Sequence, residues 1–300
     1  MAKRRKKKKR DKNNLVLLLM VLILFIGFGI IFIKYHLIPK ETPSPSPAQP
    51  DTTSPGITPP TRKSLASPKA PSSPKIPSKV AIIIDDFGYN LNSTTRGLIE
   101  LDYPITLAVL PRLSRSSEIA LLAELSGKEV ILHLPMEPCG YPDSSKNPGP
   151  GAIFCNLSED EIRKRVKENF DSLPQAVGLN NHMGSKATED QRVISTILEE
   201  VKERNLYFVD SLTTKDSCGL KVAQEKGVKS AARSIFLDHK DDPTYINGQF
   251  DRLVRLAHKE GSAIAIGHVH SKSILNVLKE RLPQLEEKGI KLVFASEVVK

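Results

Sequence analysis

From residue 80 onward, short apolar runs alternate with longer stretches in which apolar residues recur about every three to four positions. Apolar runs of about four to eight residues predict strands, and the longer spacing predicts amphipathic helices. Strands are predicted at 80–85, 105–109, 129–132, 176–179, 206–209, 229–232, 262–266 and 290–294. Helices are predicted at 92–101, 116–125, 158–170, 191–204, 220–226, 245–259 and 273–287. This order is that of repeated βα units, which build parallel sheets.

Local signals support both kinds of element. The run from Val80 to Ile84 is apolar without alternation, as in a strand that is covered on both faces. Ser158 with Glu161, and Thr188 with Gln191, have the spacing of a capping box at a helix start.

Polar residues follow almost every predicted strand. They are Asp85-Asp86, Pro111-Arg112, the segment 133–137, the segment 180–185, Asp210-Ser211, Arg233 and Gly267-His268. An open doubly wound sheet gathers its site at one switch point, whereas a barrel brings all carboxyl strand ends onto one rim. The distribution therefore favours a deformed (β/α) barrel over an open sheet.

Two kinds of metal-ligating side chain lie at these strand ends. Asp86 follows the first strand, and His133, His182 and His268 follow later strands, whereas His239, His258 and His270 are expected on helix or loop surfaces. A single Asp can cap a helix and a single His is commonly structural, but one Asp with two His is a frequent ligand set for a divalent metal. A Zn²⁺-type site formed by Asp86, His133 and His182 is therefore predicted.

Such an ion activates water for hydrolysis, which leaves two proton transfers to side chains. We expect Asp85 to act as the base and His268 to donate a proton to the leaving group. Arg233 is expected to keep Asp85 ionised or to bind substrate. The remaining polar residues at the strand ends, Glu137, Asn180, Asn181 and Asp210, are predicted to bind substrate.

The segment before residue 80 has a different composition. Residues 1–14 contain nine basic residues, and residues 15–33 are uncharged and mostly aliphatic. About 20 apolar residues span a bilayer, and flanking lysines stay in the cytoplasm. We predict an uncleaved single-pass anchor in the cytoplasmic membrane with an extracytoplasmic domain at 80–300. Residues 34–79 are rich in proline and serine and are predicted to be a disordered linker.

The net charge of +10 does not indicate nucleic-acid binding. Residues 1–79 contribute +13, so residues 80–300 carry −3. A mildly acidic domain lacks the basic surface that phosphate backbones require.

Three cysteines remain on the predicted exported side. Cys139 and Cys155 flank a loop rich in proline and glycine, and a disulfide between them would leave Cys218 free. The sequence leaves this pairing open.

Seven ordered blocks resemble one known family. They are IIIDDFG from Ile82, LAVLP from Leu107, HLPMEP from His133, VGLNNHMGSK from Val177, FVDS from Phe208, AARSIFLD from Ala231 and AIGHVH from Ala265. Together they resemble the divergent polysaccharide deacetylases, and they extend over nearly the whole domain. The resemblance implies a deformed barrel that removes acetyl groups from cell-envelope sugars with a metal held by Asp-His-His.

The same resemblance implies that Asp85 is the base, Asp86 a ligand and His268 the acid. Ordinary polysaccharide deacetylases have His-x-x-x-His on one segment, whereas here Glu137 stands four positions after His133. His182 is the best substitute for the missing histidine, and Glu137 a weaker one.

Two other functions stay open at this point. A catalytically silent module on the same fold would bind envelope glycan or a regulatory partner, and a metal hydrolase of another class would cleave a phosphoester. The acidic domain disfavours the phosphoester reading.

Overall fold

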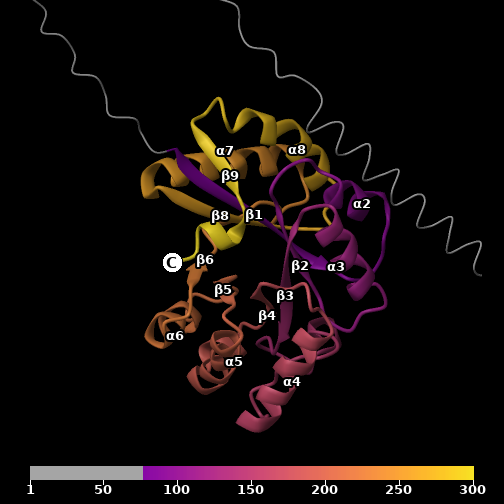
Figure 1. Cartoon of the computed structure of the whole chain (residues 1–300), viewed down its shortest axis with the longest axis vertical. Helices are drawn as coiled ribbons and strands as arrows, with labels where there is room; N and C mark the ends of the chain where they lie inside the picture. The colour runs from indigo at the N-terminus through magenta and orange to yellow at the C-terminus, as the bar shows by residue number, and fades with distance from the viewer. Residues whose placement is uncertain (1–76) are drawn as a thin grey trace, which may run out of the picture. The chain divides into compact units, whose positions relative to one another are not determined.

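The computed structural model describes residues 77–300 (Figure 1). Within them, nine strands form one sheet in which every pairing is parallel. The strands are β1 (Ser78–Phe87), β2 (Thr106–Val109), β3 (Glu129–Met136), β4 (Gly178–Met183), β5 (Tyr207–Asp210), β6 (Ser230–Ala232), β7 (Ile235–Phe236), β8 (Ser262–His268) and β9 (Ile290–Val293). Their order is β6-β5-β4-β3-β2-β1-β8-β7, and β9 pairs with β1.

The sheet is a curled half-barrel of parallel strands, so the predicted barrel-like α/β fold is confirmed, but the ring does not close. The two ends of the strand order are β6 and β7, which follow each other in the chain but do not pair. They are only three and two residues long, too short for an extended ladder. The C-terminal residue Lys300 instead exchanges two backbone hydrogen bonds with Ser230 on β6.

Helices surround the sheet on its outer side (Figure 1). They are α2 (Ser93–Ile99), α3 (Ser116–Leu125), α4 (Glu159–Asp171), α5 (Gln191–Glu203), α6 (Gly219–Lys226), α7 (Pro243–Glu260) and α8 (Ile274–Arg281). Short 3-10 turns lie at Ser144–Lys146, Ala187–Glu189, Leu282–Gln284 and Ala295–Glu297.

Alternate residues of β1 enter two different cores. Val80, Ile82 and Ile84 pack outward in the large cluster shared with the helices. Ala81 and Ile83 point inward, into a smaller cluster at the centre of the half-barrel. Because both faces are covered, the strand has no polar alternation.

The inner core fills only one end of the half-barrel. It includes Val293 of β9 and Ala295 and Val298 of the C-terminal segment. β9 pairs with Ser78–Ala81, the first half of β1, so these residues lie at the amino ends of the strands. The carboxyl ends of the strands are left for polar side chains.

The observed elements differ from the predicted ones in specific ways. β3 and β4 continue through polar residues to Met136 and Met183, and β7 was not predicted because it has two residues. The helix predicted to reach residue 287 ends at Arg281, since Pro283 follows and the chain continues in a 3-10 turn.

The helix starts give one confirmation and one correction. The capping box of Ser158 and Glu161 is present at the start of α4. The predicted box of Thr188 and Gln191 is wrong, because Asp190 caps α5 and the Thr188 hydroxyl donates to the Gly184 carbonyl.

All three cysteines are free, so the disulfide between Cys139 and Cys155 does not form in this structure. Within residues 77–300, no helix has the length and apolar composition needed to cross a membrane. The predicted anchor at 15–33, and the predicted linker up to residue 76, lie outside the described residues.

Candidate metal centre and active site

The two-residue period of the strands aligns the polar side chains. Asp85 follows Ile83 by two positions, and His133 and His268 follow the inward-facing Ile131 and Ile266 in the same way. Since successive side chains alternate between faces, all three side chains point into the half-barrel. β1 and β8 are in register there, with Asp85 opposite His268.

Asp86 should point outward by this alternation, but the backbone redirects it. Its φ is 69°, in the left-handed region that residues other than glycine rarely adopt. The pairing of β1 with β2 shifts register between Ile84 and Phe87, which is the signature of a bulge. Bulges near active sites commonly re-aim a side chain. Here the bulge brings Asp86 to the same side as Asp85.

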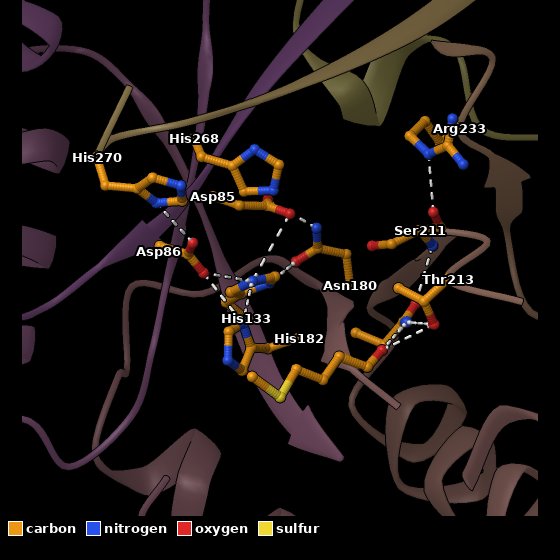
Figure 2. A network of polar contacts seen from close by, with 12 residues as sticks. Asp85, Asp86, His133, Asn180, His182, Ser211, Thr213, Arg233, His268 and His270 are labelled. Carbon is orange, nitrogen blue, oxygen red and sulfur yellow. Dashed lines mark hydrogen bonds and ion pairs between the residues drawn. The ribbon is translucent and has the colours of Figure 1, made fainter. Parts of the chain in front are cut away.

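Asp86, His133 and His182 converge in a triangle (Figure 2). Asp86 Oδ1 lies 3.2 Å from His133 Nε2 and 3.0 Å from His182 Nδ1. The two nitrogens are 3.1 Å apart. Three metal-ligating atoms from β1, β3 and β4 thus meet at one point.

These atoms fit a divalent cation. Donors held about 2.0–2.2 Å from one ion at tetrahedral or octahedral angles are about 2.8–3.6 Å apart. Asp86 Oδ1 is buried, and among the described residues it has no hydrogen-bond partner. The two imidazole nitrogens are close to this oxygen, but their N–H groups are not aligned to donate to it. Burial would raise the pKa of Asp86, but the contacts with His133, His182 and His270 outweigh it and lower this pKa. A cation held between this ionised oxygen and the two ring nitrogens would complete a set of one carboxylate and two imidazole ligands.

Asn180 connects this triangle to Asp85. Its Nδ2 donates to Asp85 Oδ1 at 2.8 Å, and its Oδ1 lies 2.8 Å from His133 Nδ1. Because the carboxamide oxygen can only accept, His133 carries its proton on Nδ1 and directs the lone pair of Nε2 to the metal site. Asn180 is fully buried, so it orients the site residues and cannot contact substrate as predicted.

Asp85 is the neighbouring buried carboxylate. Burial raises its pKa, although the charges of His133 and His268 act in the opposite direction. Its Oδ2 lies 3.6 Å from His133 Nε2. Asp85 is therefore next to the metal triangle without being part of it. A carboxylate of raised basicity beside a metal site is suited to accept a proton.

His268 is held by an acidic residue that the sequence reading did not select. Asp238 accepts hydrogen bonds from His268 Nδ1 at 2.8 Å and from its backbone N–H at 2.7 Å. Burial lowers the pKa of His268, but Asp238, together with Asp85 and Asp86, raises it to about 9. The imidazole also stacks on Phe236. His268 is therefore protonated at neutral pH, with Nε2–H as the remaining donor.

His270 was expected on the surface, yet it contacts the metal triangle. Its side chain is 70% exposed, and its Nδ1 lies 3.1 Å from Asp86 Oδ2, the oxygen that faces away from the other two histidines. The Asp86 carboxylate is thus held on both oxygens (Figure 2).

Arg233, predicted to keep Asp85 ionised or to bind substrate, makes its hydrogen bonds elsewhere. Burial lowers the pKa of Arg233, although the charge of Asp85 acts in the opposite direction. It donates from Nε to the Ser211 carbonyl at 2.8 Å and from Nη2 to the Leu212 carbonyl at 3.1 Å, and it lies over the Phe236 ring. Within residues 77–300, no hydrogen bond or ion pair joins it to Asp85. Arg233 supports the wall of the site.

Two further residues that were predicted to bind substrate form hydrogen bonds with neighbouring loop residues. Asp210 is fully buried and accepts from the Ser217 hydroxyl and the Leu212 N–H. Asn181 is 1% exposed and joins the Ser211 N–H to the Met183 carbonyl. It also lines the cavity over the metal triangle, so its contact with substrate stays a prediction.

Glu137 does not belong to the metal triangle. Its Oε1 accepts from Lys186 Nζ at 2.7 Å, and its Oε2 accepts from the Cys155 N–H at 2.6 Å. Burial raises its pKa, but the hydrogen bonds from Lys186 and Cys155 outweigh it and lower this pKa. Glu137 fastens the ends of the loop 138–154, and its alternative role as a metal ligand is wrong in this geometry.

Asp238 and His270 were not predicted as site residues, because the sequence pattern around each of them is weak. Asp238 follows the apolar residues Ile235, Phe236 and Leu237 and so obeys the rule of polar residues at strand ends, but β7 is too short to be recognised. His270 lies two residues beyond His268, and its contact depends on the turn after β8.

A cavity of about 180 Å³ lies over these residues, lined among others by Asp85, Asp86, His133 and His268. A second cavity of about 420 Å³ adjoins it and shares Asp86, His182, Met183 and His270.

Three comparisons relate this chain to known proteins. Residues 82–299 match the model of a family described as divergent polysaccharide deacetylase. The uncharacterized protein YibQ of Escherichia coli K12 is 37% identical over 228 residues, which cover 76% of this chain and 69% of that protein. An uncharacterized protein of Haemophilus influenzae is 34% identical over 210 residues, covering 70% of this chain and 73% of that one.

A solved structure shares the fold. The crystal structure of the uncharacterized protein ATU2773 from Agrobacterium tumefaciens C58 aligns with a TM-score of 0.70. The sequences are 22% identical, and the alignment covers 76% of this chain and 92% of that one.

Proposed function

Because the chain belongs to the divergent polysaccharide deacetylase family, we propose that it is a metal-dependent hydrolase that removes acetyl groups from a polysaccharide of the cell envelope. The observation that carries this proposal is the triangle of Asp86, His133 and His182. Asp85 and His268 lie beside it and supply the two proton-transfer groups that hydrolysis needs.

The ion proposed at the triangle is Zn²⁺, since one carboxylate and two imidazoles are donors that zinc accepts. When bound, it would polarise the acetyl carbonyl and lower the pKa of a water molecule toward about 7. Among the residues, Asn180 keeps His133 in the tautomer that can coordinate. His270 keeps Asp86 oriented through its second oxygen.

Asp85 takes the proton of the attacking water, whose oxygen bonds to the acetyl carbon. Asn180 holds the Asp85 carboxylate in place through Oδ1, which leaves Oδ2 free to accept the proton. His268 gives its Nε2 proton to the sugar nitrogen or oxygen as the bond to the acetyl carbon breaks. Acetate and the free amine or hydroxyl of the sugar are the products.

Asp238 is a positioning residue in this scheme. Its two hydrogen bonds fix the His268 ring and keep it charged until the leaving group needs the proton. Phe236 stacks on one face of the ring and helps to hold its orientation.

The proposed location rests on the amino-acid sequence alone. Residues 1–14 are basic and residues 15–33 are apolar, which supports a single-pass anchor with its amino terminus in the cytoplasm. The deacetylase domain would then act on the extracytoplasmic side, where envelope polysaccharide is found.

The test is acetate release from acetylated glycans by the full-length protein loaded with Zn²⁺. We expect turnover with wild type, and loss of at least about 100-fold in Asp85→Asn, which removes the base but no metal ligand. His258→Ala, on the last turn of α7, is the matched control and should keep wild-type activity. Glycan binding without turnover on any acetylated sugar would replace this proposal with the silent binding module.

A further inference from the structure

A groove lies at the amino ends of the strands, on the opposite face of the half-barrel from the metal triangle. Its volume is about 660 Å³, which is within the range of about 300–1,000 Å³ that is usual for ligand pockets. One wall is the turn before β2, with Tyr103 and Pro104, and the other is formed by residues 282–292. This basal groove, which Pro77 also lines, shares no residue with the two cavities at the metal triangle.

The lining of the basal groove is mostly apolar and presents rings to solvent. Pro283 is exposed, and Tyr103 and Pro104 are half-buried, above the buried side chains of Leu282 and Leu285. Within residues 77–300, the Tyr103 hydroxyl makes no hydrogen bond, so it can donate to a ligand carbonyl. Grooves lined by aromatic rings are the usual binding sites of proline-rich segments in the polyproline II conformation.

Both walls of the groove are held by hydrogen bonds of the domain itself. The Tyr103 carbonyl accepts from the Ile105 N–H at 2.9 Å and from Lys128 Nζ at 3.1 Å. On the other wall, the Leu285 carbonyl accepts from the Ile290 N–H at 3.0 Å. A groove that is formed in advance loses little conformational entropy when a ligand binds.

The described part of the chain begins at this groove. Its first residue, Pro77, is exposed and lines the groove, and the next residue, Ser78, pairs with Ile290 of β9. Proline has no N–H to donate to a neighbouring strand, which agrees with a strand that starts at Ser78. The covalent bond to Pro77 therefore brings the preceding segment to the basal groove.

That preceding segment has the spacing of a polyproline II ligand. Pro68, Pro71, Pro74 and Pro77 follow one another at intervals of three residues, whereas the earlier prolines, within residues 41–60, have no constant interval. A polyproline II helix has three residues per turn, so prolines at this interval lie on one face. In this conformation, the face that carries Pro77 also carries Pro74 and Pro71.

The charges of the groove fit the same segment. The exposed lining residues Glu286 and Lys291 have opposite charges, so the groove suits a ligand with few charges. Residues 70–76 have one charged side chain, that of Lys75. Glu286 forms no ion pair within residues 77–300 and can pair with it. An exposed ion pair adds little affinity, so this contact sets the register of the segment.

We propose that residues 70–76 bind in the basal groove as a polyproline II segment, with their prolines against the rings of Tyr103 and Pro283. The groove is then an interaction surface for the linker of the same chain. The folded unit begins near residue 70, and the free part of the predicted linker ends before it. The proposal depends neither on the hydrolase activity nor on the metal.

Trypsin digestion of the full-length protein in detergent measures whether the segment is bound. The Lys75–Ile76 bond lies inside the segment, and the Lys63–Ser64 bond lies earlier in the same linker. In Tyr103→Ala, cleavage after Lys75 should be at least about tenfold faster than in wild type, because the bound population falls. Cleavage after Lys63 should change less than about twofold. Each bond is compared with itself, so the effect of neighbouring prolines on trypsin cancels.

Two further variants keep this test decisive. Tyr245→Ala is the matched control, because Tyr245 is a half-buried tyrosine on α7 that does not line the groove, and both bonds should be cleaved as in wild type. Pro283→Ala changes the exposed ring of the second wall and should also accelerate cleavage after Lys75. Urea unfolding shows whether each variant is folded, so Pro283→Ala decides the test if Tyr103→Ala is not.

A peptide in solution tests the same groove without proteolysis. In a full-length variant with residues 70–76 replaced by glycine and serine, the groove should be open to a fluorescent peptide of residues 68–77. Its Kd should be at least about tenfold lower than for wild type, whose own segment competes at a millimolar effective concentration. A peptide of the same composition without the three-residue interval should bind at least about tenfold more weakly.

Three results would overturn the proposal. The first is an equal rate of cleavage after Lys75 in wild type and in the folded groove variants. The second is equal binding of the two peptides, or binding of neither. The third is a wild-type dimer that disappears when residues 70–76 are replaced, since the segment would then fill the groove of a second copy.

Discussion

Replacing Asn180 by leucine removes both hydrogen bonds that join the metal triangle to the base. The two residues have similar volumes, so the change is chemical more than steric. In the wild type, Asn180 accepts from His133 Nδ1 and donates to Asp85 Oδ1, both at 2.8 Å and both fully buried. The variant leaves a buried imidazole N–H and a buried carboxylate oxygen without these partners.

The magnitude follows from those two groups. A buried group left unpaired costs about 1–3 kcal/mol, which predicts a fall of about 2–6 kcal/mol in the free energy of unfolding. Loss of the residue that orients a metal-ligating histidine weakens metal affinity by about 10- to 100-fold. Asn180→Leu should therefore lose both stability and metal.

Asn180→Asp separates the two effects. Its carboxylate still accepts from His133 Nδ1, so we expect metal affinity closer to wild type than in Asn180→Leu. It cannot donate to Asp85, and instead places a second negative charge beside the base, so acetate release should fall by at least about 100-fold.

Urea unfolding, Zn²⁺ competition against a chelating dye and acetate release measure these quantities. Asn169→Leu is the matched control, because Asn169 of α4 is also fully buried but donates from Nδ2 to the Gly151 carbonyl, away from the site. It should lose stability and keep its metal affinity. Wild-type metal affinity in Asn180→Leu would refute the role of Asn180.

Two other variants test neighbouring contacts. Asp238→Asn removes the main group that raises the pKa of His268 to about 9. The raised pKa of His268 stabilises the folded state below the unfolded pKa of about 6.5, and this stabilisation is lost as the pH rises through about 9. In the metal-free protein, the difference in free energy of unfolding between wild type and Asp238→Asn should therefore shrink between pH 6 and 10. A difference that grows with pH would contradict the assignment. Glu137→Gln breaks the ion pair with Lys186, so proteolysis within 138–154 should accelerate while metal affinity stays within about twofold of wild type; loss of the metal would restore Glu137 as a ligand.

Much of the fold was readable because burial on both faces gives the strands an apolar run. β1, β2, β5 and β8 lie where such runs predicted them. The ends of β3 and β4 were missed because their last inward residues are polar by function, so the apolar pattern stops before the strand does. Whether the ring closes could not be predicted, because β6 and β7 are too short to show an apolar pattern.

The site was readable where it follows the strands. Asp85, His133, His182 and His268 come together because inward positions at the carboxyl ends of parallel strands share one rim. The partners of these residues were harder to assign. Asn180 and Asp210 occupy strand ends as substrate ligands would, and only their burial shows that they bond to other protein groups.

The contacts of Asp86 depend on backbone geometry that no residue pattern specifies. Its left-handed φ and the bulge after Ile84 turn its carboxylate toward both His182 and His270. The turn that brings His270 back to Asp86 follows β8 and contains no apolar pattern. The same limit applies to Asp238, whose position depends on the pairing of β7 with β8.

X-ray absorption at the zinc edge of the full-length protein tests the central claim most directly. One bound ion with two imidazole ligands and one carboxylate oxygen is predicted for wild type, and His182→Ala should lose one imidazole from that shell. A zinc shell with a single imidazole in wild type, or an unchanged shell in His182→Ala, would contradict the metal centre of Asp86, His133 and His182.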